Sequence, residues 1–170
     1  MINLIDNDFF YIKNNFQMYE DVVSNQLYGI RRQKPVVSIM IPTYLRNDYL
    51  KETIDSAISQ DTDEDYEIVV VDNNPDIRDT STLNLINMYD QKRVSYYKNT
   101  ENLGMFGNWN RCLELANGSW VLILHDDDTI KKDYISNMLK ITRKFPDTSC
   151  VGCSNTLIDG NNNLILQKPK

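Results

Sequence analysis

The sequence predicts an α/β fold with a mostly parallel sheet and helices on both of its faces. Segments typical of strands and of helices alternate along residues 35–170, which is the pattern of parallel strands joined by crossover helices. Residues 120–124 are apolar without a break, as expected for a strand that is buried on both faces of such a sheet. Several expected strands end in polar residues, and ligands bind at the carboxyl ends of strands in open α/β sheets. The sequence therefore predicts a sheet with a binding site at one edge.

The first part of this domain has the pattern of a strand, a helix and a second strand. Residues 36–41 are rich in β-branched side chains and end before a proline, which predicts the first strand. A helix is expected over residues 47–60, because an Asn–Asp pair can cap its start and apolar residues follow at helical spacing. Residues 67–71 predict the second strand, which ends at a turn-forming run of Asp, Asn and Pro.

The rest of the domain continues this alternation. A third strand is expected at residues 94–97, and residues 120–124 form the fourth. The other expected segments are a helix at 80–91, a loop at 99–107, helices at 108–116 and 133–145, a strand at 149–158 and its hairpin partner at 163–166.

Residues 1–34 are interpreted as a helical extension that precedes the domain at 35–170. Its apolar residues recur at helical spacing; they are Phe9, Ile12, Phe16, Tyr19, Val23 and Leu27. We expect this apolar stripe to pack on the domain or on a partner chain, and a homodimer is therefore one expectation.

Composition narrows the class of protein. A chain of 170 residues is long enough for one domain with a core, and its net charge of -6 disfavours broad nucleic-acid binding. No apolar run approaches the length of a membrane span and the start lacks a signal-peptide core. We therefore expect a cytoplasmic protein, with peripheral contact at the inner face of a membrane left open. Cys150 and Cys153 form a CxxC, but without a second cysteine pair we favour small buried strand residues over a zinc or redox site.

Three predicted strands end in residues that can bind a ligand. Pro42, Thr43 and Tyr44 follow the first strand, Asp72 ends the second, and three aspartates follow the fourth. Since parallel strands end at the same edge, these groups are expected to lie together. Thr43 could bond a base or cap its loop, and Tyr44 could stack on a base or pack. Asp72 could accept a hydrogen bond from a base or ribose, or bond its own backbone in a turn.

Three adjacent carboxylates, at Asp126, Asp127 and Asp128, repel one another. A bound Mg²⁺ or Mn²⁺ would relieve this repulsion, because both cations prefer oxygen ligands. Neighbouring side chains at a strand exit alternate in direction, so one aspartate could reach a ribose while the next binds the metal. The alternative is a solvated acidic loop before a helix. His125 could be a ligand, or could orient or pack.

The motifs VSIMIPTYLRNDYLKETIDSAISQ, YEIVVVDNN and ENLGMFGNWNRCLELANGSWVLILHDDD resemble the inverting glycosyltransferase family 2, of GT-A fold. The resemblance covers about residues 36–160 and implies a Rossmann-like nucleotide-binding half. It implies the following positions for donor binding: Pro42, Thr43, Tyr44, Asp72, Asn102, Gly104 and Asp126. It also implies that Asp127 and Asp128 bind Mn²⁺ or Mg²⁺. The family's usual D-x-D-D spelling has His125 at its first position here.

The activity that the resemblance implies is transfer of a sugar from a nucleoside-diphosphate sugar, with UDP-sugars favoured, to an acceptor hydroxyl. The acceptor would be a saccharide or a lipid-linked group in cell-surface polysaccharide synthesis. The family's catalytic base lies further downstream, and Asp159 comes too early for it, so the chain is expected to be the N-terminal donor-binding part. Two alternatives to a glycosyltransferase are a non-catalytic nucleotide-binding or regulatory module and a phosphotransferase that forms an aspartyl phosphate. The phosphotransferase would need a D-x-D-x-T motif, and Ile130 stands at the position of its threonine.

Overall fold

The computed structural model describes residues 15–160 and 163–165. Two compact units divide the chain, one at residues 1–135 and the other at residues 136–170. The sheet and the predicted binding residues all belong to the first unit.

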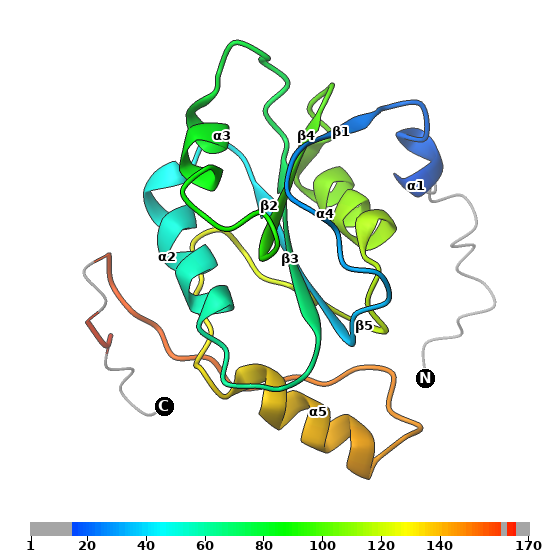
Figure 1. Ribbon diagram of the computed structural model, residues 1–170, viewed down its shortest axis with the longest axis vertical. Coiled ribbons are helices and arrows are strands. Elements are labelled where there is room, and N and C mark those ends of the chain that lie inside the picture. Colours follow the sequence, from blue (N-terminus) through cyan, green and yellow to red (C-terminus); the bar gives the residue numbers. More distant parts are fainter. Residues whose placement is uncertain (1–14, 161–162, 166–170) are drawn as a thin grey trace, which may run out of the picture. The chain divides into compact units, whose positions relative to one another are not determined.

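The first unit contains a five-stranded sheet (Figure 1). Its strands are β1 (Ser24–Tyr28), β2 (Val37–Thr43), β3 (Tyr66–Asp72), β4 (Val94–Asn99) and β5 (Trp120–Ile123). They are arranged in the order β1-β4-β3-β2-β5, and the last four are parallel to one another. Only β1 is antiparallel to its neighbour, β4. This arrangement confirms the predicted α/β fold class.

Helices cover both faces of the sheet, with α2 and α3 on one side and α4 on the other (Figure 1). The described helices are α1 (Asn15–Met18), α2 (Asn47–Ile58), α3 (Ser81–Ile86), α4 (Gly104–Leu115) and α5 (Tyr134–Lys144). Helix α3 is shorter than its predicted range, because the chain turns after Ile86. Helix α4 begins four residues earlier than predicted, at Gly104, so part of the expected loop is helical.

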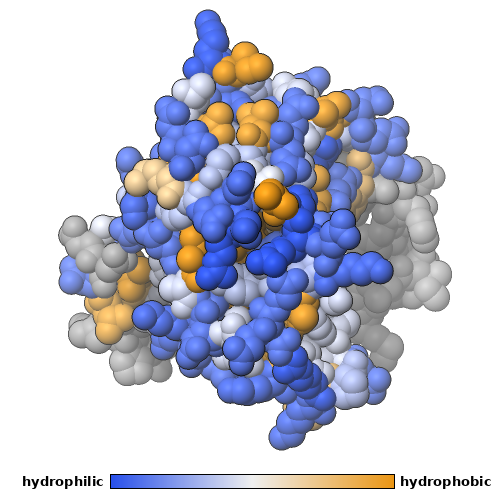
Figure 2. Space-filling model, in the orientation of Figure 1, coloured by the Kyte–Doolittle hydropathy of each residue, from blue (hydrophilic) through white to orange (hydrophobic). Residues whose placement is uncertain are grey.

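The core lies between the sheet and these helices. On the α4 face, Met40, Val69, Val71 and Cys112 form one buried cluster with Tyr97. On the α2 face, the buried side chains of the helix are Leu50, Thr53, Ile54 and Ala57. Strands β2 and β3 are buried along nearly their whole length, which explains their continuous apolar sequence. The face shown in Figure 2 is mostly hydrophilic, and its apolar residues form small separate patches.

The predicted helical extension is wrong for residues 24–28, which form strand β1. Helix α1 has only four residues, and β1 pairs with β4 from Ser24 to Tyr28. Val23 and Leu27 fit a helical period but are about half exposed, so no buried helical face holds them. The open edge of β4 offers backbone hydrogen bonds that outweigh this local periodicity. Phe9 and Ile12 lie outside the described residues, and the homodimer stays a prediction.

The strand predicted at residues 149–158 is also wrong. Residues 150–157 have no regular structure and are mostly exposed, and Cys150 and Cys153 are free and exposed. The predicted hairpin is reduced to one antiparallel bridge between Ile158 and Leu164. Among the described residues of this second unit, no longer strand is available to pair with the segment, so its apolar residues alone do not make it a strand.

Candidate functional site

The register of the sheet brings three strand ends to one edge. Thr43, the last residue of β2, pairs with Asp72, the last residue of β3, and Asn73 N donates to Thr43 O at 2.9 Å. On the other side of β2, Leu124 N donates to Met40 O at 2.9 Å. The chain after β5 therefore leaves the sheet beside the loop after β2, as the sequence predicted.

A pocket of about 410 Å³ lies at this edge. Its wall comes from the end of β2, from the loops after β2, β3, β4 and β5, and from the start of α4. The lining residues are Pro42, Thr43, Tyr44, Arg46, Asn73, Asn102, Gly104, Met105, Asn108, Trp109, His125 and Asp126. Six of the predicted donor-binding residues thus share one cavity, and the seventh, Asp72, lies outside its lining.

Asp72 is fully buried behind the pocket wall. Its Oδ1 accepts a hydrogen bond from Asn74 N at 2.9 Å, and its Oδ2 accepts one from the Tyr96 hydroxyl at 2.8 Å. Burial raises the pKa of the Asp72 carboxyl, against the opposing effect of the hydrogen bonds from Asn74 and Tyr96 and of the charge on Lys98. These contacts match the turn-forming alternative for Asp72, and its contact with a base stays a prediction.

Asn73 holds in place the loop of Asn102, Leu103 and Gly104, here called the N-x-G loop, a role that the sequence did not indicate. Its Nδ2 donates to Asn102 Oδ1 at 2.8 Å and to Gly104 O at 3.2 Å. Its Oδ1 accepts from Leu103 N at 2.9 Å and from Asn99 Nδ2 at 3.1 Å. Gly104 has a φ of 69°, a left-handed conformation that favours glycine. This network of amides fixes the part of the pocket wall that Asn73, Asn102 and Gly104 form.

Asp126 is buried and points to the loop after β2. Its Oδ2 accepts a hydrogen bond from Thr43 Oγ1 at 2.8 Å. Its Oδ1 lies 3.4 Å from Nη1 of Arg46, and the same nitrogen lies 2.7 Å from Oδ2 of Asp127. These carboxylates raise the pKa of the Arg46 guanidinium, and the hydrogen bond to Asp127 is the largest cause. Arg46 is a site residue that the sequence analysis missed.

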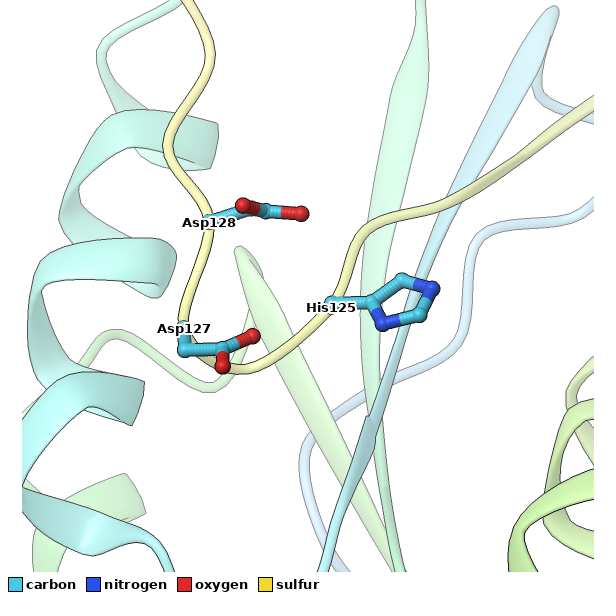
Figure 3. Close-up of side chains that lie close together, drawn as sticks. All are labelled: His125, Asp127 and Asp128. Carbon is cyan, nitrogen blue, oxygen red and sulfur yellow. The ribbon is translucent and has the colours of Figure 1, made fainter. Parts of the chain in front are cut away.

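Asp127 and Asp128 form a group with His125 at the start of the next loop (Figure 3). One ligand atom from each residue lies within 4.8 Å of those of the other two. A turn brings them together, because Asp128 N donates to His125 O at 3.1 Å. Asp127 and Asp128 were predicted as metal ligands, and His125 as either a ligand or a residue that orients or packs; the structure brings the three together, and their binding of a metal stays a prediction. Asp126, by contrast, turns toward Thr43.

Trp109 contributes an aromatic wall next to this group. Its ring centroid lies 4.9 Å from that of His125, with the planes at 64°, and Phe106 meets Trp109 edge to face at 5.4 Å. Such T-shaped contacts are favourable for aromatic rings. This contact packs the imidazole of His125 against Trp109 at the wall of the pocket, which both residues line.

The family model for "Glycosyl transferase family 2" matches residues 38–168 of the sequence. The chain belongs to glycosyl transferase family 2. The chain is 33% identical over 107 residues to one relative, the GalNAc(5)-diNAcBac-PP-undecaprenol beta-1,3-glucosyltransferase of Campylobacter jejuni. The aligned region covers 62% of the chain and 34% of that relative. The chain spans about half, or less, of the length of the curated relatives it first matches.

Solved structures confirm the GT-A type of fold for this family 2 chain. The structure of S. aureus TarS in complex with UDP-GlcNAc has a TM-score of 0.58 at 23% identity, over 71% of this chain and 37% of that one. The mannosyltransferase PcManGT from Pyrobaculum calidifontis, in complex with GDP-Man and Mn²⁺, has a TM-score of 0.55 at 23% identity. That match covers 68% of this chain and 35% of PcManGT.

Within residues 15–160 and 163–165, no helix of the family 2 chain is both long enough and apolar enough to cross a membrane.

Proposed function

We propose that this chain is the donor-binding part of a glycosyltransferase that uses a nucleoside-diphosphate sugar, with UDP-sugars favoured. The sugar would pass to a hydroxyl of a saccharide or lipid-linked acceptor in cell-surface polysaccharide synthesis. The observation that carries this proposal is the pocket at the carboxyl ends of the strands, which Thr43, His125 and Asp126 line. Asp127 and Asp128 lie outside this lining, and His125 groups with both of them. The undecaprenol in the name of the C. jejuni relative and the UDP-GlcNAc bound to TarS support it.

The nucleoside would lie between the loop after β2 and the N-x-G loop. Tyr44 is about half exposed at the pocket, so its ring is free to stack on a base. Asn102 and Gly104 lie on the facing wall, held there by Asn73. The buried Asp126 carboxylate lies deeper in the pocket and would accept hydrogen bonds from the ribose.

The diphosphate would lie next to His125, Asp127 and Asp128. The two carboxylates are oxygen ligands of the kind that Mn²⁺ and Mg²⁺ prefer, and the Mn²⁺ in PcManGT supports a divalent cation in this fold. When bound, such a cation would supply positive charge to the leaving diphosphate. That charge matters in a protein with a net charge of -6, since an acidic surface repels a nucleotide anion. We further propose that the protein works in the cytoplasm or at the inner face of a membrane.

Calorimetric titration with UDP, GDP, CDP and ADP, each with and without Mn²⁺, tests this proposal. We expect UDP to bind, and to bind more tightly with Mn²⁺ present. Absence of binding by every nucleoside diphosphate with the metal would contradict the proposal. A second assay, release of UDP from UDP-sugars with and without candidate acceptors, separates an enzyme from a non-catalytic nucleotide-binding module, because the module would bind without turnover.

A further inference from the structure

Arg46 is a cation that already occupies part of the carboxylate site. It stands directly before α2 and lines the pocket. Its Nη1 contacts Asp127 Oδ2 at 2.7 Å and Asp126 Oδ1 at 3.4 Å. One guanidinium thus lies between two carboxylates that belong to the site proposed above for the ribose and the cation.

This arrangement places Arg46 and a divalent cation in competition. Asp127 is both the partner of Arg46 and a member of the group with His125 and Asp128. A divalent cation bound to the Asp127 carboxylate would lie within a few ångströms of the Arg46 guanidinium. The two groups are both positively charged, so this arrangement is unfavourable. The Arg46 side chain is 52% exposed, so it has room to leave Asp127 when a cation arrives.

A diphosphate would offer the displaced guanidinium a new partner. Arginine presents a planar fork of donors that matches phosphate oxygens, and Arg46 already faces the cavity where the diphosphate is proposed to lie. A ligand that takes Arg46 away from Asp127 makes this carboxylate available to the cation. By linkage, the cation then strengthens binding of that ligand by the same factor.

We propose that Arg46 is an internal counter-ion that competes with the divalent cation for Asp127 and is released by the diphosphate of the donor. Arg46 would therefore make the cation bind weakly to the empty site and strongly together with the donor. This inference rests on the proposed function. A purely structural Arg46, which only holds the loop of Asp126 and Asp127 in place, would have the opposite effect: its removal would weaken cation binding.

The test measures free Mn²⁺ by electron paramagnetic resonance in titrations of three proteins: wild type, Arg46→Gln and Arg32→Gln. Arg32 is the matched control, because it pairs with Asp65, the residue before β3, at the opposite edge of the sheet. Loss of an exposed ion pair corresponds to a change of about two- to fivefold. We expect Arg46→Gln to bind Mn²⁺ alone about two- to fivefold more tightly than wild type, and Arg32→Gln to match wild type.

The same titrations with UDP present complete the test. UDP should raise the Mn²⁺ affinity of wild type, and this enhancement should be about two- to fivefold smaller in Arg46→Gln. Equal or weaker Mn²⁺ binding by Arg46→Gln, including no binding by either protein, would overturn the inference. Circular dichroism checks that the variant is folded. Failure of the proposed function looks different: wild type would then bind no Mn²⁺–UDP at all.

Discussion

Thr43 Oγ1 donates a 2.8 Å hydrogen bond to Oδ2 of Asp126 and so ties the end of β2 to the loop after β5. Both residues are buried, and they are 83 positions apart in the sequence. The hydrogen bond fixes the direction of Asp126, and the following turn then sends Asp127 and Asp128 toward His125. The arrangement of the site thus begins with this contact.

Replacement of Thr43 by Val should destabilise the protein. The variant keeps the shape of the side chain but removes the donor to a buried carboxylate, which costs about 1–3 kcal/mol in the free energy of unfolding. Urea unfolding of Thr43→Val and Thr43→Ser measures the effect, since the serine variant keeps the hydroxyl. Equal stability of the two variants would show that the hydrogen bond contributes little.

Leu45 has a φ of 57°, a left-handed conformation that is unfavourable for a leucine. It stands between two residues that line the pocket, Tyr44 and Arg46, and its own side chain is exposed and outside the lining. We expect Leu45→Asn to raise the free energy of unfolding by about 0.5–1 kcal/mol, because asparagine tolerates this conformation. Leu113, an exposed leucine in α4, is the control. If Leu113→Asn stabilises the protein equally, backbone strain at Leu45 is not the cause.

Arg31 and Glu67 form a largely buried ion pair. It lies near the amino-terminal end of β3, at the end of the strand away from the pocket. Arg31 Nε lies 2.9 Å from Glu67 Oε2, and its Nη2 donates to Glu67 Oε1 at 3.0 Å. Arg31→Met would leave a buried carboxylate without its counter-charge, so we expect a loss of about 3 kcal/mol in thermal or urea unfolding. The exposed pair of Arg32 and Asp65 is the comparison. Arg32→Met should change stability by less than about 0.5 kcal/mol, and similar losses in both variants would contradict this account.

The three cysteines should differ in reactivity. Burial raises the pKa of the Cys112 thiol, so at pH 8 it stays protonated and out of reach of reagents, while Cys150 and Cys153 are exposed. A disulfide-forming chromogenic reagent should label two thiols in the native protein and three after unfolding. Cys112→Ser should give two under both conditions. Rapid labelling of three thiols in native wild type would disprove the burial of Cys112.

Those parts of the fold that depend on long apolar strands could be predicted from the sequence. The runs that became β2 and β3 are buried parallel strands, as expected. The run that became β5 is a parallel strand too, but it lies at the edge of the sheet and is only partly buried, so its expected burial on both faces is wrong. The meeting of Thr43 and Asp126 follows from the parallel pairing of β2 with β5. Strand β1 could not be predicted in this way. Its sequence, SNQLY, is mostly exposed, and it is a strand because the edge of β4 is available to pair with it.

The missed site residues depend on contacts between segments far apart in the chain. Arg46 reaches Asp127 only because the backbone turns at Leu45, and a left-handed leucine has no sequence signal. Asn73 reads as part of a turn until the N-x-G loop is placed beside it. Trp109 was within a predicted helix, but its contact with His125 depends on how α4 packs against the chain after β5.

We propose that the carboxylates after β5 hold a cation and a nucleoside diphosphate together. The most direct measurement is the affinity for Mn²⁺ in the presence of UDP, by electron paramagnetic resonance, for wild type, Asp127→Asn and Asp63→Asn. Asp63 is an exposed aspartate in the loop before β3, at the opposite edge of the sheet, and matches the change in charge. We predict that Asp127→Asn loses at least about tenfold in affinity while Asp63→Asn binds as wild type does. Wild-type affinity in Asp127→Asn would contradict the claim.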